Sequence, residues 1–593
     1  MDSPELRSFA NSPFMVGVSG HRDLQTADLP RLREAVTGFV RQLKAHLPDT
    51  ELRLIVGMAA GADLLVAETA AGLGICVEAV LPMPLEHYVA DFDGATVASL
   101  RELLRHPHVR CVELSHAMPE PAAGTPHSPA QRDAMYAHLT DTLIRRSSLL
   151  LALWDGKVSP LAGGTADTVL RYLGRRTDEQ PGPQTLELVD ALEDADATER
   201  LVYWTPTARS GSGDAADSRA PCYLWGAGDG PLQVQYTMPG PLKRQLAELN
   251  SYNREFRELR AASRLTEGSS LIDGLPDSLP LHDRHLLEHV DAQYRKADAL
   301  AVYYQRRSDR LFHLFGIMAF AMGVAYLVYE KLTDDRALLI AYLFILLTGM
   351  GVYYVLQGKR WFGKHLTYRA LAETLRARFY LRLAGADRCV DAAAVLALSG
   401  IERFHGFGWI VYVLKGIEPS EAAAAPGGEL DSEGVFRIEQ AWIENQYAYF
   451  TRKVERLERS HRRRKRLRQA IVVIILAIIC ALFMFSDALH HIDMGLGVPL
   501  KNWLTFAMGM MAVLLGVWEL HQDKMATREL LWQYRNQRNH FARARAQLTR
   551  MTTPRCRVAV LAELGKDSLM ESYLWAIHRY HREHEPPAAG GGT

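Results

Sequence analysis

The residues best suited to chemistry lie in three short segments in the first third of the chain. They read GVSGHRD at residues 17–23, GMAAGADLLVAE at residues 57–68 and WDGKVSPLAGGTADT at residues 154–168. Glycine lets backbone N–H groups approach a phosphate closely, and a helix that begins directly after such a turn points its positive end at the anion. Three turns of this kind predict a site for a phosphate-bearing ligand such as a nucleotide.

Each of these segments follows a short apolar run that predicts a buried strand. Such runs occur at residues 14–18, 52–56, 75–81, 109–114, 148–154 and 200–206, and amphipathic stretches separate most of them. Continuous apolar strands between helices are typical of a parallel sheet that helices cover on both faces. The predicted fold class is therefore α/β, with a Rossmann-like, doubly wound parallel sheet at the N-terminus. In such sheets ligands bind at the carboxyl ends of the strands, where all three segments would meet.

The predicted ligand contacts are residues of the three segments that would lie at that edge, and none of them is assigned a catalytic or metal-binding role. They are Ser19, Gly20, His21, Arg22, Gly57, Ala59, Gly61, Ala62, Asp63, Trp154, Asp155, Gly163, Gly164, Thr165 and Thr168. His21 and Arg22 would neutralise a phosphate, although exposed loop residues are often simply solvated. Asp155 would accept a hydrogen bond from a ribose hydroxyl. Asp63 and Thr165 also have a plain explanation, because an acid complements a helix dipole and a hydroxyl at the N-cap position caps a helix.

Four apolar runs in the second half of the chain predict membrane-spanning helices. They cover residues 311–329, 337–356, 470–485 and 503–518, and they form two pairs with short polar loops. About twenty residues cross the hydrocarbon core, so the third run has to extend to residue 489. The alternative is a hydrophobic core of a soluble helical domain, but helices of that kind normally carry a polar stripe.

Basic residues flank these runs on one side of the expected membrane. Arg306, Arg307 and Arg310 precede the first run, and HRRRKRLR at residues 461–468 precedes the third. The positive-inside rule then places both termini and the middle segment in the cytoplasm, in a protein that crosses the cytoplasmic membrane several times. The run at 461–468 could instead be a nucleic-acid-binding patch, but its position against an apolar segment favours topology and contact with anionic lipid headgroups.

These patterns divide the chain into six segments. We expect a nucleotide-binding domain at residues 1–245 with surface insertions at 174–220, and a helical connector at 246–310. These are followed by a first hairpin at 311–356, a cytoplasmic helical region at 357–469, a second hairpin at 470–520 and C-terminal helices with a tail at 521–593. The stretch at 418–433 is rich in Ala, Pro and Gly and predicts a loop. Each hairpin lies between long charged helical patterns, which indicates a duplicated unit.

Charge and cysteine content exclude several kinds of partner. Lys plus Arg equals Asp plus Glu at 68 each, so the net charge does not favour a nucleic-acid partner. The six cysteines are scattered and show no spacing of a metal site. Sparse, unpaired cysteines are typical of a reducing compartment. The first residues also lack the apolar core of a signal peptide, so we expect the first domain to stay in the cytoplasm.

The three glycine-containing segments together resemble the SLOG superfamily, named after the DNA-processing and cytokinin-activating LOG proteins, over about residues 15–206. The membrane units, with YRALAETLRARF after the first hairpin, are similar to the SLATT-type two-helix effectors that accompany SLOG domains. The resemblance implies an effector of bacterial antiviral defence that forms a homo-oligomer. Its activating ligand would be a nucleotide second messenger, cyclic or derived from ADP-ribose, made by a partner synthase; no other cofactor is implied.

One departure from the family pattern bears on catalysis. The hydrolytic members place a Glu three residues after the Thr of their glycine turn, and here Thr168 stands at that position. Without this carboxylate the segment lacks an evident general acid for N-glycosidic cleavage. Sensing without turnover is therefore the favoured interpretation. A membrane-tethered nucleotide hydrolase that uses Glu68 or Asp155, and an interaction scaffold without a ligand, are the alternatives.

Overall fold

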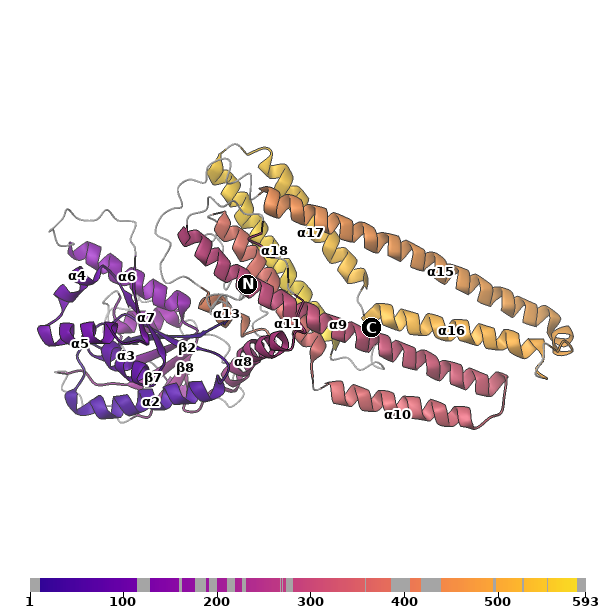
Figure 1. Cartoon of the computed structure of the whole chain (residues 1–593), viewed down its shortest axis with the longest axis horizontal. Coiled ribbons are helices and arrows are strands. Elements are labelled where there is room, and N and C mark those ends of the chain that lie inside the picture. The colour runs from indigo at the N-terminus through magenta and orange to yellow at the C-terminus, as the bar shows by residue number, and fades with distance from the viewer. Residues whose placement is uncertain are drawn as a thin grey trace. The chain divides into compact units, whose positions relative to one another are not determined.

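A computed structural model shows the fold, and Figure 1 labels its elements. The described residues are 11–114, 128–158, 163–175, 188–190, 200–210, 219–226, 231–266, 268, 270–273, 281–357, 359–384, 406–417, 439–493, 497–524, 527–551 and 553–583. Most of the insertions expected at 174–220 and the loop expected at 418–433 lie outside these residues.

A sheet forms the centre of the N-terminal part. Its described strands run in the order β4-β3-β2-β1-β5-β7-β8-β9-β6. The first six in this order are mutually parallel, as the apolar runs predict: β1 (Phe14–Gly20), β2 (Leu52–Val56), β3 (Cys76–Leu81), β4 (Val109–Glu113), β5 (Leu149–Trp154) and β7 (Val202–Pro206). The order reverses between β1 and β5, which is the position where doubly wound sheets bind ligands.

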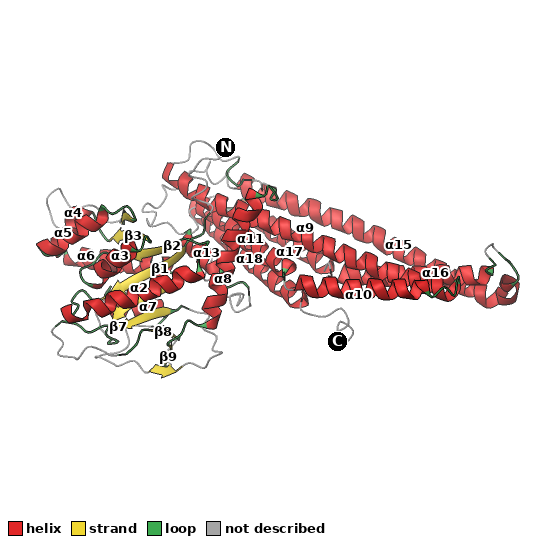
Figure 2. Cartoon of the chain, turned by 60° about the horizontal axis from the view of Figure 1, so that its bottom comes forward, coloured by secondary structure: helices red, strands yellow, loops and turns green. Residues whose placement is uncertain are grey.

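Helices cover both faces of this sheet. Helices α6 (Pro129–Arg146) and α7 (Thr165–Tyr172) pack against the face that includes Met15 and Leu150. Helix α2 (Leu29–His46) covers the other face, where Phe39 stacks on Tyr203 with ring centroids 4.2 Å apart. Helix α3 (Ala62–Gly72) follows β2 directly. The expected Rossmann-like arrangement is thus present in the parallel part, as Figure 2 shows.

The sheet is not wholly parallel, which corrects the sequence-based prediction. Strand β8 (Cys222–Trp225) runs antiparallel to β7, and β9 (Leu232–Gln235) runs antiparallel to β8. Strand β6 (Leu188–Asp190), inside the expected insertion, pairs with β9. The segment between β8 and β9, residues 226–231, is too short for the crossover that a parallel neighbour requires, whereas an antiparallel neighbour needs only a loop.

Between β3 and β4 the chain forms three short elements. They are α4 (Leu85–Tyr88), the 3-10 turn η2 (Val89–Asp91) and α5 (Gly94–Leu104). The break lies at Asp93, whose backbone is extended and whose carboxylate accepts a hydrogen bond from the N–H of Thr96 at 2.8 Å. An Asp at this position caps a new helix instead of continuing the old one.

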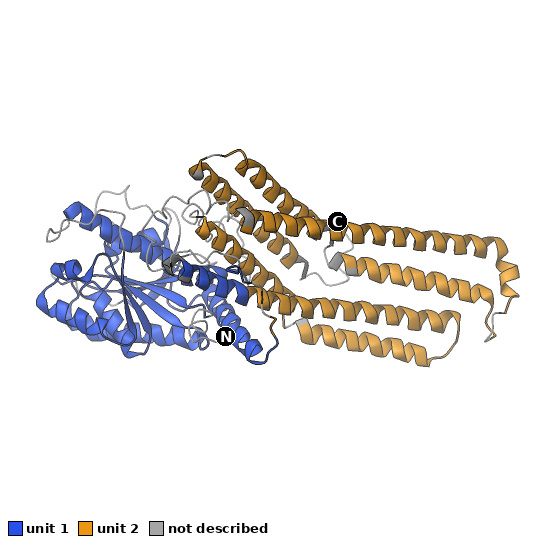
Figure 3. Ribbon diagram, turned by 45° about the horizontal axis from the view of Figure 1, so that its top comes forward, with its two compact units in different colours: residues 1–264, 269–296, 391–431 blue, residues 265–268, 297–390, 432–593 orange. Residues whose placement is uncertain are grey.

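The chain forms two compact units, coloured separately in Figure 3. Unit 1 consists of Met1–Arg264, Ser269–Lys296 and Asp391–Asp431. It contains the sheet, helix α8 (Gly240–Ala261), the beginning of α9 (Leu281–Lys331) and the short helix α13 (Ile410–Gly416). Unit 2 consists of Leu265–Gly268, Ala297–Val390 and Ser432–Thr593.

Unit 2 is helical in its described residues and repeats one order of elements. The first set is α9, α10 (Ala337–Gln357) and α11 (Trp361–Leu383). The second is α15 (Asn445–His490), preceded by the π-helical turn η5 (Glu439–Glu444), then α16 (Leu500–Lys524) and α17 (Thr527–Leu548), with α18 (Pro554–Glu583) at the end. Four of these helices, α9, α10, α15 and α16, are long and apolar enough to cross a membrane. The chain is therefore a membrane protein of two helical hairpins.

Close packing joins the two hairpins within unit 2. A Cβ atom added at Gly323 of α9 would lie 2.5 Å from Cγ1 of Val513 on α16. A Cβ atom added at Gly509 of α16 would lie 2.7 Å from a methyl group of Leu327 on α9. Helices in lipid associate through small residues because these let the backbones approach. The contact indicates that α9 and α16 form the centre of the membrane region.

Candidate functional site

The candidate site lies where the sheet order reverses, at the carboxyl ends of β1 and β5. The two strands are paired in register up to Gly20 and Leu153. The N–H of His21 extends this pairing by donating to the carbonyl of Leu153 at 3.1 Å. Because both chains leave the sheet here, His21 and Asp155 come to lie side by side although 134 residues separate them.

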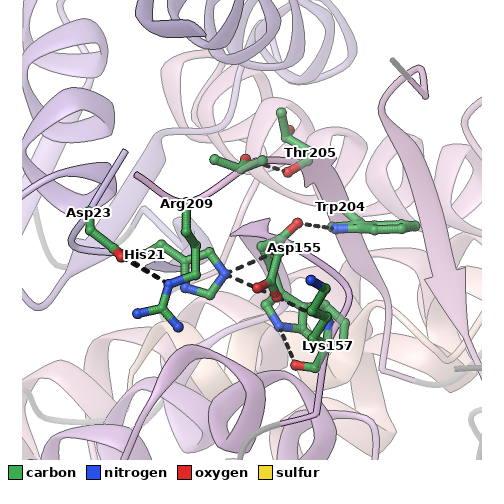
Figure 4. A network of polar contacts seen from close by, with 9 residues as sticks. His21, Asp23, Asp155, Lys157, Trp204, Thr205 and Arg209 are labelled. Carbon is green, nitrogen blue, oxygen red and sulfur yellow. Dashed lines mark hydrogen bonds and ion pairs between the residues drawn. The ribbon is translucent and has the colours of Figure 1, made fainter. Parts of the chain in front are cut away.

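His21 and Asp155 form a close polar pair (Figure 4). The ring Nε2 of His21 lies 3.0 Å from the backbone N of Asp155 and 3.2 Å from its carboxylate Oδ1. A neutral ring accepts the backbone N–H at Nε2 and carries its proton on Nδ1, whereas a charged ring donates from Nε2 to the carboxylate. Within the described part of the chain, Nδ1 has no hydrogen-bond partner, so a ring that carries a proton on Nδ1 can donate it to a ligand.

The surroundings keep Asp155 ionised. Burial by itself would raise the pKa of this carboxyl, but hydrogen bonds from His21 and from the N–H of Lys157, with the charge of Arg209, lower the pKa below its ordinary value. The Lys157 N–H lies 3.0 Å from Oδ1. Asp155 thus offers a charged acceptor at the strand end.

Arg209 is a further charged residue at this edge that the sequence analysis missed. It follows β7, and its Nε lies 3.0 and 3.1 Å from the two carboxylate oxygens of Asp23. Ser210 reinforces the contact by donating from its N–H to the carbonyl of Asp23 and from its hydroxyl to the carbonyl of Leu24. The run at 200–206 predicted the strand, so its carboxyl end could have been searched for a cation in the same way as the other three ends.

The loop after β2 is held closed by its own acid. The N–H of Ala59 donates to Oδ2 of Asp63 at 3.1 Å, and the N–H of Ala62 donates to the carbonyl of His21 at 3.0 Å. Asp63 is 7% exposed, and burial raises its pKa to about 7 although the Ala59 bond and the charge of Arg22 oppose the shift. Asp63 therefore shapes the loop and is half-protonated near neutral pH.

The turn before α7 has a similar internal acid. The N–H of Gly163 donates to Oδ2 of Asp167 at 2.8 Å. Gly164 is the N-cap of α7, which has no side-chain cap, so the prediction that the hydroxyl of Thr165 caps this helix is wrong: Thr165 is already the first helical residue. Thr168 is 2% exposed and donates to the carbonyl of Gly164 at 3.0 Å. The first N–H groups of α7 have no acceptor within the helix, as at the amino end of any α-helix.

The remaining predicted residues differ in exposure. Ser19 and Gly20 end β1, with Ser19 only 9% exposed. Arg22 is exposed, and its guanidinium lies 5.3 Å from the ring centre of Tyr136. Three others are buried and help to hold the loops in place, namely Gly57, Ala62 and Trp154.

The side chains near the site provide hydrogen-bond donors and acid–base groups but no metal ligand set. No group of three His, Cys, Asp or Glu residues that could hold a metal occurs in the described residues. Comparisons of this chain with protein-family models, with curated proteins and with solved structures find no match. The interpretation of the site therefore depends on its geometry.

Proposed function

We propose that the chain is a nucleotide-sensing membrane effector. The observation that carries the proposal is the contact of His21 with Asp155 at the reversal of the sheet order, with the charge of Arg209 close enough to lower the pKa of that carboxyl. Helix α7 begins after the loop that follows β5 at the same edge. A phosphate there would accept from Nδ1 of His21, from the Arg209 guanidinium and from the first N–H groups of α7, while Asp155 would accept from a sugar hydroxyl. The nucleotide would be a second messenger, cyclic or derived from ADP-ribose.

The hydrogen bonds within the two glycine turns bear on how such a ligand would bind. Asp63 and Asp167 already occupy two N–H groups of the glycine turns. A phosphate at either turn would have to displace a carboxylate, which costs a hydrogen bond, or to bind beside it. Protonation of Asp63 would lower the charge repulsion, since burial raises its pKa to about 7. We therefore expect nucleotide affinity to rise as the pH falls from 8 to 6.

The membrane part of the proposal concerns what binding does. The ligand would be made by a synthase during phage infection. The chain would form a homo-oligomer in the inner membrane with both termini in the cytoplasm. Binding would then rearrange the hairpins so that the membrane leaks. The four long apolar helices support this role. A ligand moves this equilibrium only by its preference for the leaking state, and a change from mostly closed to mostly open takes about 5.5 kcal/mol.

A membrane-tethered nucleotide hydrolase is the second candidate. The observation in its favour is the His21–Asp155 contact at 3.2 Å, because a His beside a carboxylate is a common general acid–base arrangement. Asp155 would orient and stabilise the charged ring, and His21 would transfer the proton. Glu68 is a weaker candidate for the acid, because Arg33 already pairs with it at 2.7 Å.

Ligand binding and turnover on the full chain in lipid nanodiscs test these alternatives. ATP, ADP-ribose, cyclic ADP-ribose and a cyclic dinucleotide are each added, and thermal stabilisation and product formation are followed. Stabilisation without product supports the sensor, and product formation supports the hydrolase. If no nucleotide stabilises the protein and no product forms, both proposals are contradicted. We expect His21→Ala and Arg209→Ala each to weaken binding about tenfold or more, as the loss of a charge-assisted hydrogen bond implies. His46→Ala, at the far end of α2, is the matched control.

A further inference from the structure

Helix α13 has an unexpected place in the fold. In sequence it lies between the two membrane hairpins, after α11 and before α15. In the structure it belongs to unit 1, where it contacts β1 and the helices α6 and α8. Trp409, which precedes the helix, is 2% exposed, and Val413 is fully buried. A segment between the hairpins is thus built into the core of the domain that carries the candidate site.

The start of β1 is one of its contacts. The ring of Tyr412 meets Phe14, the first residue of β1, edge to face with centroids 5.0 Å apart, and its hydroxyl donates to Gln245 of α8. A Cβ atom added at Gly416 would lie 2.9 Å from the carbonyl oxygen of Pro13. The backbone of α13 therefore reaches the residue directly before β1.

The start of β5 and the end of α7 form the second contact. Nζ of Lys415 donates to the carbonyl of Ser147, two residues before β5 begins. The hydroxyl of Tyr172, the last residue of α7, donates to the same carbonyl at 3.3 Å. Nζ of Lys415 also lies 5.6 Å from the ring centre of Tyr172. One lysine thus joins α13 to two further elements.

Each of these three elements carries part of the candidate site at its other end. His21 follows β1, Asp155 follows β5, and Gly164 caps the start of α7. A strand of this length spans about 20 Å, and hydrogen bonds to its neighbours hold its register along that length. If ligand binding shifts β1, β5 or α7 relative to the other two at the site, the distances between their opposite ends also change. Helix α13 contacts those opposite ends.

The start of β1 has a second link toward the membrane. The hydroxyl of Ser12 donates to Gln293 of α9 at 2.7 Å, and its N–H donates to Asn253 at 3.3 Å. Helix α9 continues from there as one helix to Lys331, through the first apolar segment. Helix α9, which leads into the first hairpin, is therefore bonded to Ser12, two residues before β1 begins.

We propose that α13 is a docked coupling helix. It contacts the amino ends of β1 and β5 and the carboxyl end of α7, so that a relative movement of these three elements at the site changes the contacts of α13. The inference uses the proposed nucleotide function for the origin of the movement. The coupling itself does not depend on the ligand, because coupling is reciprocal: a change at α13 must also change the site.

Hydrogen exchange on the full chain in nanodiscs, without nucleotide, tests this reciprocity. The double variant Lys415→Met/Tyr412→Phe keeps the apolar stems and the ring but removes both hydrogen bonds. We expect exchange to rise about threefold or more in α13 and also at residues 19–24 and 154–158, about 20 Å away. Val411→Ala, at the partly exposed position of the same helix, should leave the distant residues unchanged.

Two results would overturn the proposal. If α13 exchanges faster and the site residues do not, the helix is only a structural plug. A second variant, Gly416→Val, forces a side chain against the Pro13 carbonyl. If neither variant loosens α13, these contacts do not hold it and the coupling model is wrong. Failure of nucleotide binding in the separate binding experiment would leave both outcomes unaffected, so the two proposals can fail independently.

Discussion

Gly61→Ala should distort the candidate site by a backbone clash. Gly61 has φ of +78° and ψ of −113°, a conformation that side chains rarely allow. A Cβ atom there would lie 2.3 Å from the carbonyl oxygen of Arg22 and 2.7 Å from that of His21. Both neighbours are backbone atoms, so the loop that holds His21 must move, and the hydrogen bond from the N–H of Ala62 to the His21 carbonyl must lengthen.

The size of the effect follows from these contacts. The unfavourable backbone conformation costs about 1 to 3 kcal/mol, and a weakened buried hydrogen bond adds about 1 kcal/mol. Against this, alanine reduces the freedom of the unfolded chain and returns about 0.5 to 1 kcal/mol. We expect a net destabilisation of unit 1 of about 1 to 3.5 kcal/mol, toward the upper end because the clash falls on backbone that cannot rotate away.

Native-state hydrogen exchange of the β1 and β5 amides measures this difference for unit 1 alone. Gly38→Ala is the matched control, because Gly38 lies in the middle of α2 with no atom within 4 Å of the added Cβ. That substitution should stabilise by about 0.5 to 1 kcal/mol. If the two variants differ by less than about 1 kcal/mol, the loop is softer than its contacts indicate and the argument for a preformed site fails.

Three further predictions concern pH and the membrane region. Because the folded pKa of Asp63 is raised to about 7, this group adds stability at low pH that is lost as the pH rises from its unfolded pKa through 7. The free energy of unfolding of the wild type should therefore fall by about 2 kcal/mol between pH 5 and 8 in the same exchange experiment. Asp63→Asn, which keeps an acceptor for the loop, should abolish this pH dependence. Gly323→Val should lower the melting temperature by forcing α9 from α16, whereas Gly516→Val, with open space around the added Cβ, should not. In a cysteine-free background, a cysteine at Asp334 should react with an impermeant reagent outside intact cells and one at Thr593 should not, and labelling at Thr593 would contradict the two-hairpin topology.

The sequence was most informative where one physical pattern repeats. Apolar runs between glycine turns predicted the six parallel strands, because buried parallel strands need continuous apolar side chains. The uncharged runs likewise predicted the four membrane-length helices. The antiparallel extension of the sheet was missed, because β8 and β9 are only four residues each and lie between polar segments.

The site was predictable in part. Placing His21 and Asp155 at one edge required only the strand order, but their direct contact required the register of β1 against β5. The pairing of the turn N–H groups with Asp63 and Asp167 depends on loop geometry, which composition does not determine. The return of α13 to the sheet is a tertiary contact across hundreds of residues, and no local pattern indicates it.

The most direct test of the central claim is a calorimetric titration of the full chain in nanodiscs with the nucleotide that gives the largest thermal stabilisation. The wild type is compared with Gly164→Glu, which places bulk and negative charge at the N-cap of α7. The account predicts binding to the wild type and loss of binding in Gly164→Glu while the sheet amides keep their protection. Equal affinity in both proteins would contradict a phosphate site at this end of α7.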